Sequence, residues 1–134
     1  MNISFNSLNI SGIWFFAFSL FYILLTLNVV RMRWATKTGL GVGEDRRMLK
    51  AVRVHGNFAE YIPLVFIGII LMEVRGAGST WLHSLYAAAF LARILITFGI
   101  TKTSNFSPYR FLGNCLTYIV LLSAGIWNLT ESLG

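Results

Sequence analysis

Five polar side chains recur at helical spacing where a basic segment runs into an apolar one. At steps of four, three, four and three residues, they are Arg46, Lys50, Arg53, Asn57 and Glu60. At about 100° per residue, these steps place all five within roughly 80° of one face of an α-helix. Arginine, lysine and asparagine donate hydrogen bonds to anions, and a carboxylate accepts from an amine. The stripe predicts either a site for a small anionic ligand that carries an amine or amide, or a polar core with a structural role.

A second, weaker stripe lies near the C-terminus. Arg110, Asn114 and Thr117 follow one another at steps of four and three. Arg110 either extends to the membrane surface or meets the first stripe on a neighbouring chain. An arginine beside a thiol favours the thiolate and lowers the thiol pKa. Together with Arg31, these residues predict a strongly basic site that suits an anionic ligand.

Composition identifies the elements that must carry these residues. Of 134 residues, 56% are hydrophobic and 12% charged, against about 25% charged in a typical soluble domain. Crossing a bilayer takes about 20 helical residues, and lipid requires every backbone polar group to be bonded internally. We therefore predict an all-α integral membrane protein: one four-helix transmembrane domain over residues 1–134. The expected spans are about 9–30, 54–74, 80–100 and 110–129.

The distribution of positive charge predicts the orientation of these spans. Seven of the eleven lysines and arginines lie in the loop 31–53, and the loop 101–109 adds Lys102. Because basic loops stay in the cytoplasm, both termini are expected on the non-cytoplasmic side. The basic cluster directly follows an apolar segment, which favours membrane topology over nucleic-acid binding. The glycine-rich segment 39–45 predicts a flexible linker, and a helix is expected from about Glu44 onward.

Two charges fall within the predicted spans. Glu60 lies about 10 Å along the second helix from Arg53, and Arg93 lies about 12 Å from the same membrane face along the third. Because these helices run antiparallel, the depths match, and we predict a structural Glu60–Arg93 ion pair. The single Cys115 supports no disulfide within the chain, and His55 and His83 have no second ligand at metal spacing, so no metal site is predicted.

The segment from Arg53 to Pro63 carries a recognisable pattern. Its form, R-x-x-x-N-x-x-E-Y-x-P, resembles the second-helix signature of the MAPEG family, the membrane-associated proteins in eicosanoid and glutathione metabolism. Ala92-Arg93 with Gly99 on the third span, and Pro108-Tyr109-Arg110 at the start of the fourth, support the resemblance. The sequence RVHGNFAEYIP is most similar to that of short bacterial members, so we expect a bacterial inner membrane protein.

The resemblance implies a homotrimer of four-helix bundles that binds glutathione as a co-substrate between adjacent subunits, near the cytoplasmic face. It implies that Arg110 comes from the neighbouring subunit and stabilises the glutathione thiolate as the catalytic residue. Arg93 matches a buried arginine of the family. The residues that the family pattern assigns to glutathione binding are Arg31, Lys50, Arg53, Asn57, Glu60 and Tyr61.

The chain departs from the family pattern at several positions. Ile96 and Ile100 stand where many members have Tyr or His, Gly56 replaces an arginine, and Phe111 follows Arg110 in place of a serine. Several polar contacts to glutathione are therefore missing, which disfavours prostaglandin or leukotriene synthesis.

Three functions fit these observations. The first is a glutathione-dependent transferase or peroxidase that acts on small hydrophobic electrophiles in the lipid bilayer. The second is a catalytically reduced binding or structural protein that keeps the polar core for folding and trimerisation. The third is a small proton-coupled exporter with an intramembrane glutamate, which the basic character of the site disfavours.

Overall fold

Four long helices make up the protein. The computed structural model describes residues 8–134, and within them the regular structure is entirely α-helical. The helices are α1 (Asn9–Thr36), α2 (Arg46–Val74), α3 (Ser79–Lys102) and α4 (Pro108–Leu133). All four are long and apolar enough to cross a membrane, which confirms the predicted fold class.

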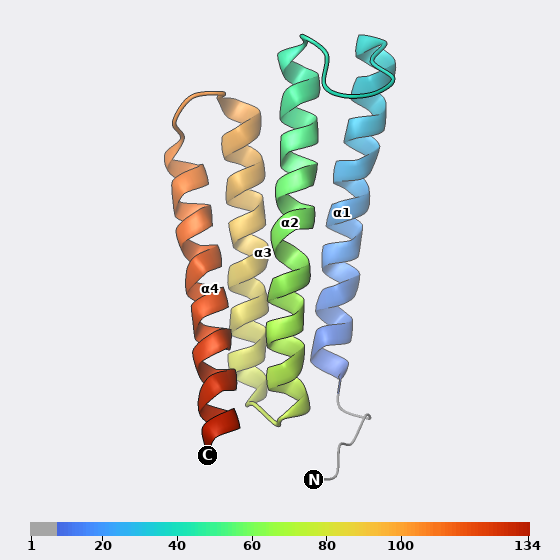
Figure 1. Ribbon diagram of the computed structural model, residues 1–134. Helices are drawn as coiled ribbons and strands as arrows, with labels where there is room; N and C mark the ends of the chain where they lie inside the picture. Colours follow the sequence, from blue (N-terminus) through green and yellow to red (C-terminus); the bar gives the residue numbers. More distant parts are fainter. Residues whose placement is uncertain (1–7) are drawn as a thin grey trace.

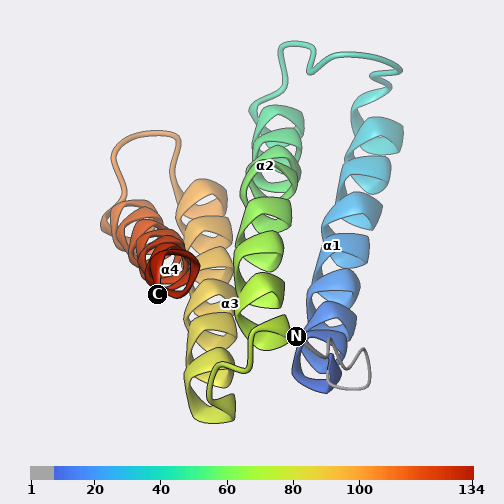
Figure 2. The same cartoon turned by 60° about the horizontal axis from the view of Figure 1, so that its bottom comes forward.

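The helices lie side by side, with α2 and α3 between α1 and α4 (Figure 1). The α1–α2 and α3–α4 linkers lie at one end of the bundle, and α1 begins and α4 ends at the other. The rotated view shows α1 and α4 at opposite edges (Figure 2). The basic segments 31–53 and 101–109 therefore lie at the same end of the bundle.

The predicted loop 31–53 is mostly helical. α1 continues to Thr36 and α2 already begins at Arg46, so the linker covers only residues 37–45. With 29 residues at 1.5 Å each, α2 extends about 43 Å, well beyond a hydrocarbon core of about 30 Å. Part of the first polar stripe therefore lies on helix outside the hydrocarbon region.

Specific capping contacts fix the ends of the α1–α2 linker. The Asp45 carboxylate accepts a hydrogen bond from the backbone N–H of Arg47 at 2.7 Å and begins α2. Hydrogen bonds from the Arg47 side chain and backbone hold the pKa of the Asp45 carboxyl below its ordinary value. On the α1 side, the Arg33 guanidinium donates to the carbonyl oxygens of Thr38, Gly39 and Gly41. Arg33 thus holds the glycine-rich linker against the end of α1.

α1 packs on the bundle along one narrow line. Its buried residues, Ser11, Phe18 and Leu25, recur every seven positions. The Phe18 ring lies 5.1 Å from the centroids of both the Phe66 ring of α2 and the Phe90 ring of α3. Most other apolar side chains of α1 remain exposed in the single chain.

A buried carboxylate anchors the start of α1. Glu73, near the end of α2, is 5% exposed. Its two oxygens accept the backbone N–H groups of Ile10 and Ser11, each at 2.9 Å, and the Ser11 hydroxyl. The Ser11 hydroxyl in turn lies 2.8 Å from the Tyr86 hydroxyl of α3. Because the first N–H groups of a helix lack partners and carry positive partial charge, Glu73 caps α1 from another helix.

Replacing Glu73 by alanine is expected to destabilise the protein by about 2–3 kcal/mol, because it leaves buried donors of α1 without an acceptor. Thermal unfolding of the full chain in detergent measures this loss. Glu131→Ala, which removes an exposed carboxylate at the end of α4, is the matched control. Equal melting temperatures for the two variants would contradict the anchoring role of Glu73.

Candidate functional site

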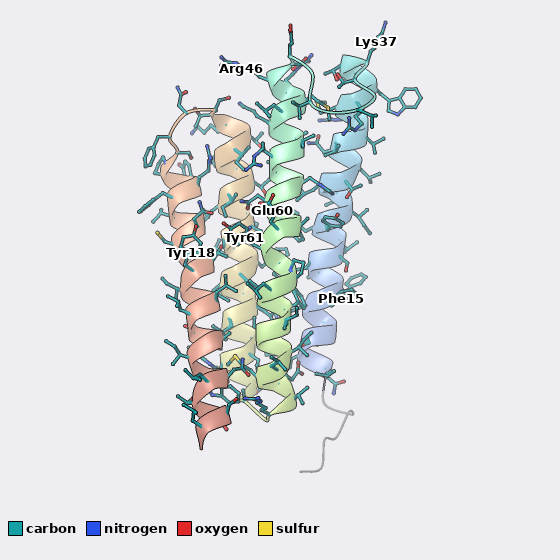
Figure 3. All side chains as sticks on the ribbon, viewed as in Figure 1. Phe15, Lys37, Arg46, Glu60, Tyr61 and Tyr118 are labelled. Atoms are coloured by element: carbon teal, nitrogen blue, oxygen red, sulfur yellow. The ribbon has the colours of Figure 1, made fainter. Side chains whose placement is uncertain are left out.

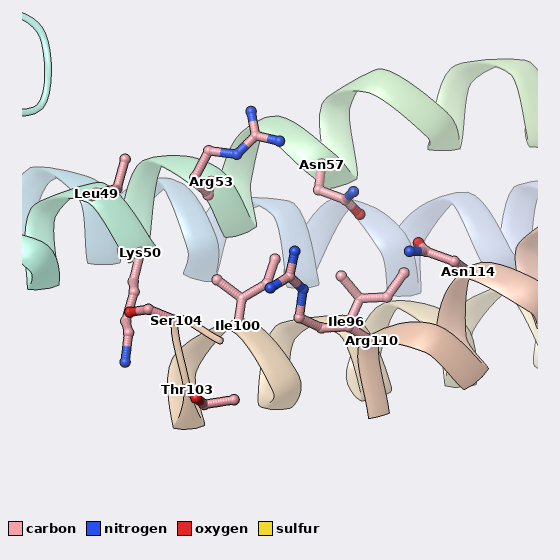
Figure 4. Close-up of a pocket in the computed structure, with 10 residues that line it drawn as sticks. All are labelled: Leu49, Lys50, Arg53, Asn57, Ile96, Ile100, Thr103, Ser104, Arg110 and Asn114. Carbon is pink, nitrogen blue, oxygen red and sulfur yellow. The ribbon is translucent and has the colours of Figure 1, made fainter. Parts of the chain in front are cut away.

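A basic cavity opens at the linker end of the bundle, between α2, α3 and α4. Its volume is about 280 Å³. Arg53 and Asn57 of α2 lie across from Arg110 and Asn114 of α4, with Ile96 and Ile100 of α3 between them (Figure 4). The remaining lining residues are Leu49, Lys50, Thr103 and Ser104. Among residues 8–134 no carboxylate lines the cavity, so its electrostatic character is strongly positive.

The two polar stripes contribute unequally to this cavity. Lys50, Arg53 and Asn57 lie three or four residues apart and share the side of α2 that faces the cavity. Arg110 and Asn114 meet them from α4. Arg46 and Glu60, at the two ends of the first stripe, do not line the cavity.

Gly99 brings Arg110 to the cavity. A Cβ atom at this position of α3 would lie 2.6 Å from Cγ and 2.9 Å from the backbone nitrogen of Arg110. Any larger residue at position 99 would displace the first turn of α4. The close approach of α3 and α4 therefore places the Arg110 side chain against the α3 wall.

The cationic side chains of the cavity differ in how many hydrogen bonds they make within the chain. Lys50 Nζ donates to the carbonyl oxygen of Thr101 at 2.9 Å, at the end of α3. Arg110 makes one long contact, 3.4 Å, to the carbonyl oxygen of Asn105. Arg53 is exposed and has no hydrogen-bond partner within residues 8–134. Arg53 and most of the Arg110 donors are thus available to a ligand.

The predicted contribution of Arg110 from a neighbouring subunit stays a prediction, but within the single chain Arg110 belongs to the same cavity as the first polar stripe. Arg110 lines it together with Lys50, Arg53 and Asn57 of the same chain. The tight packing of α4 against Gly99 of α3 holds Arg110 at this position.

The predicted Glu60–Arg93 ion pair is wrong, because Arg93 has other hydrogen-bond partners in this structure. In the part of the chain that is described, no carboxylate oxygen lies within 4.0 Å of Arg93. Arg93 Nη1 donates to the side-chain oxygen of Asn57 at 2.7 Å and to its backbone oxygen at 3.2 Å, and Nη2 donates to the Thr117 hydroxyl. Glu60 has the expected depth, but three residues of helix turn it about 60° away from Asn57. Its side chain is exposed on α2.

The other predicted ligand residues lie outside the cavity. Tyr61 places its ring 5.3 Å from the Arg93 guanidinium and 6.5 Å from the Tyr118 ring of α4. Figure 3 shows Glu60 and Tyr61 midway along α2. Arg31 is exposed on α1 and donates to the side-chain oxygen of Asn28 at 3.1 Å. The single chain thus brings together Lys50, Arg53, Asn57 and Arg110, but not Arg31, Glu60 or Tyr61.

Three lining residues were missed by reasoning from the sequence. Thr103 and Ser104 belong to the short α3–α4 linker, and Leu49 lies beside Lys50 on α2. Only the polar linker composition gave a signal for the first two. Ile96 and Ile100, identified as departures from the family pattern, form the apolar wall of the cavity.

A second, apolar groove lies between α1 and α2. Its volume is about 710 Å³, and aromatic rings from both helices line it, among them Phe15, Phe18, Tyr22, Phe58 and Phe66. The His55 ring stacks on Tyr22 near this groove, with centroids 4.8 Å apart. This surface is suited to lipid chains or to another apolar helix.

Comparison with known proteins places the chain in a family. A curated relative, the inner membrane protein YecN of Escherichia coli K12, is 30% identical over 105 residues, which are 78% of this chain and 78% of that protein. YecN of Escherichia coli O6:H1 (strain CFT073) matches to the same extent. No solved structure has significant similarity to the chain.

The sequence profile of the MAPEG family matches residues 11–130, which include all the cavity residues. The match covers all four helices except for a few residues at the start of α1 and the end of α4. The chain therefore belongs to the MAPEG family.

Proposed function

We propose that the protein is a membrane-bound, glutathione-dependent transferase or peroxidase that acts on small hydrophobic electrophiles. The observation that supports this most is the cavity, in which one chain places Lys50, Arg53, Asn57 and Arg110 around a single space. Glutathione carries two carboxylates and a thiol, and three cationic side chains suit such an anionic tripeptide.

Arg110 is the proposed catalytic residue. Its guanidinium has free donors at the cavity wall, and a positive charge next to a thiol lowers the thiol pKa. Lys50, Arg53 and Asn57 hold the tripeptide so that its sulfur lies next to Arg110. In the transferase reaction, the thiolate bonds to an electrophilic carbon and the leaving group departs. Ile96 and Ile100 provide the apolar wall against which the electrophile packs.

A neighbouring copy of the chain would complete the site. Glu60 is exposed on a membrane-spanning helix, and a carboxylate facing lipid costs about 2.5–3.5 kcal/mol even on the milder insertion scale. Arg31 is exposed on α1 and does not line the cavity of its own chain. We propose a homotrimer in which Arg31 reaches the cavity of the adjacent subunit. Glu60 and Tyr61 would then support the bound tripeptide from α2.

The proposed location is a bacterial inner membrane, with both termini on the non-cytoplasmic side. YecN is an inner membrane protein, and the helix ends and linkers that carry most of the basic residues lie at one end of the bundle. The positive-inside rule places that end in the cytoplasm.

A catalytically reduced binding protein is the second candidate. Ile96 and Ile100 line the cavity without any hydroxyl or imidazole donor, so a ligand has fewer polar partners on α3. A cation exporter fits less well, because the lining residues are basic and include no carboxylate.

Replacing Arg110 by alanine is expected to lower the rate of conjugation to a nitroaryl chloride by about 10²–10³-fold, because one preorganised donor to the developing charge is lost. The measurements are thiolate absorbance and conjugation in detergent with added glutathione. Lys102→Ala is the matched control, because Lys102 is an exposed cation at the end of α3 that does not line the cavity. Wild-type protein that neither binds nor turns over glutathione would contradict the transferase proposal and favour the non-enzymatic candidate.

Mixed trimers test the contribution of the neighbouring chain. Arg31→Ala and Arg110→Ala chains, each inactive alone, are co-expressed with different tags and purified as mixed assemblies. If Arg31 acts across the interface, about one site in three of each mixed trimer regains both arginines. Native mass spectrometry gives the subunit number, and conjugation activity gives the recovery. Mixed trimers without activity would place Arg31 outside the neighbouring site.

A further inference from the structure

We propose that Arg93 is a positioning residue for the basic cavity, which it serves by fixing the orientation of the Asn57 amide. Arg93 does not line the cavity. It acts through its hydrogen bond to Asn57, whose side chain does line the cavity. The inference rests on the proposed function for the identity of the ligand, although the orientation of Asn57 can be measured without one.

The hydrogen-bond chemistry of arginine determines which way the amide points. A guanidinium has only donors, so the Asn57 atom at 2.7 Å from Arg93 Nη1 must be the side-chain oxygen. The amide nitrogen, with its two hydrogens, then lies on the other side of the group. Because Asn57 lines the cavity, these two donors are the ones presented to an anionic ligand.

Arg93 itself has little freedom to turn. Its side chain is 2% exposed, and its second terminal nitrogen donates to the hydroxyl of Thr117 on α4. That hydroxyl donates its own hydrogen to the carbonyl oxygen of Gly113 at 2.8 Å, so its lone pairs are left for Arg93. The Tyr61 ring covers the guanidinium at 5.3 Å. Arg93 is therefore fixed between α2 and α4 while it donates a hydrogen bond to Asn57.

The acceptors of Arg93 are neutral, which separates this role from a structural ion pair. In the described part of the chain no carboxylate pairs with it, and its Nε atom has no partner. A buried cation without a counter-ion leaves a positive charge next to the cavity. Because the local dielectric constant is low, the field of this charge is screened less than it would be in water. An anion in the cavity gains from this charge as well as from the amide donors.

Asn57→Asp separates the two roles. The substitution gives Arg93 a carboxylate partner, so a purely structural Arg93 would be held as well or better. It also replaces the amide donors by an oxygen that repels an anionic ligand. We expect a melting temperature at or above that of the wild type, together with a loss of glutathione affinity of about tenfold or more.

Arg93→Met removes the guanidinium and keeps an apolar side chain of similar length. We expect about a tenfold loss of glutathione affinity. Adding Arg93→Met to Asn57→Ala should lower affinity by a smaller factor than Arg93→Met does alone, because only the buried charge is then left to remove. Arg93→Lys keeps the buried cation and replaces Arg93→Met if that variant does not fold. Asn128→Leu is the matched control. It removes a part-buried amide of α4 that donates to the carbonyl oxygen of Gly68 on α2 at 2.9 Å, away from the cavity, so it should lower the melting temperature while affinity stays within about twofold.

The experiment is isothermal titration of the full chain in detergent with glutathione, with the side-chain amide signal of Asn57 followed by NMR. Support for the positioning role is a joint loss of affinity and a shifted Asn57 signal in Arg93→Met, with neither change in Asn128→Leu. Unchanged affinity in Arg93→Met or Asn57→Asp, or an unmoved Asn57 signal in Arg93→Met, overturns it. If the wild type does not bind glutathione, the proposed function fails, and the Asn57 signal alone decides the orientation.

Discussion

A cation buried between membrane-spanning helices must find acceptors within the bundle, and this constraint shapes the linker end of the protein. Arg93 of α3 satisfies it with the oxygens of Asn57 on α2 and the hydroxyl of Thr117 on α4. Lipid chains are as apolar as leucine, so apolar contact alone gives little specificity to helix packing in a bilayer. One guanidinium therefore sets the relative rotation of three helices, and it does so directly beneath the basic cavity.

The other end of the bundle uses a carboxylate in the same way. Glu73 of α2 receives the first N–H groups of α1, while Ser11 connects it to Tyr86 of α3. α1 has few buried residues of its own, so this contact and the ring cluster around Phe18 fix its position. The two polar contacts have different roles. The Arg93 contacts position the cavity, and the Glu73 contacts attach α1, the helix that carries Arg31.

Composition and charge distribution were sufficient to predict the four helices, because a bilayer permits few other structures for long apolar segments. Helical periodicity also predicted that Lys50, Arg53 and Asn57 share a face. Pairing between helices could not be predicted so well. Depth alone suggested Glu60 as the partner of Arg93, but the rotation of each helix depends on packing, which depends on small residues such as Gly99. The capping role of Glu73 could not be predicted, because nothing in its local sequence shows that the start of α1 lies against it.

The chain belongs to the MAPEG family, and its cavity combines cationic side chains with an apolar wall of Ile96 and Ile100. A crystal structure of the full chain grown in lipid with glutathione tests the central claim most directly. The account predicts glutathione in contact with Arg53, Asn57 and Arg110 of one chain, with Arg93 donating to the Asn57 oxygen. Glutathione bound elsewhere, or Arg93 turned towards Glu60, would contradict it.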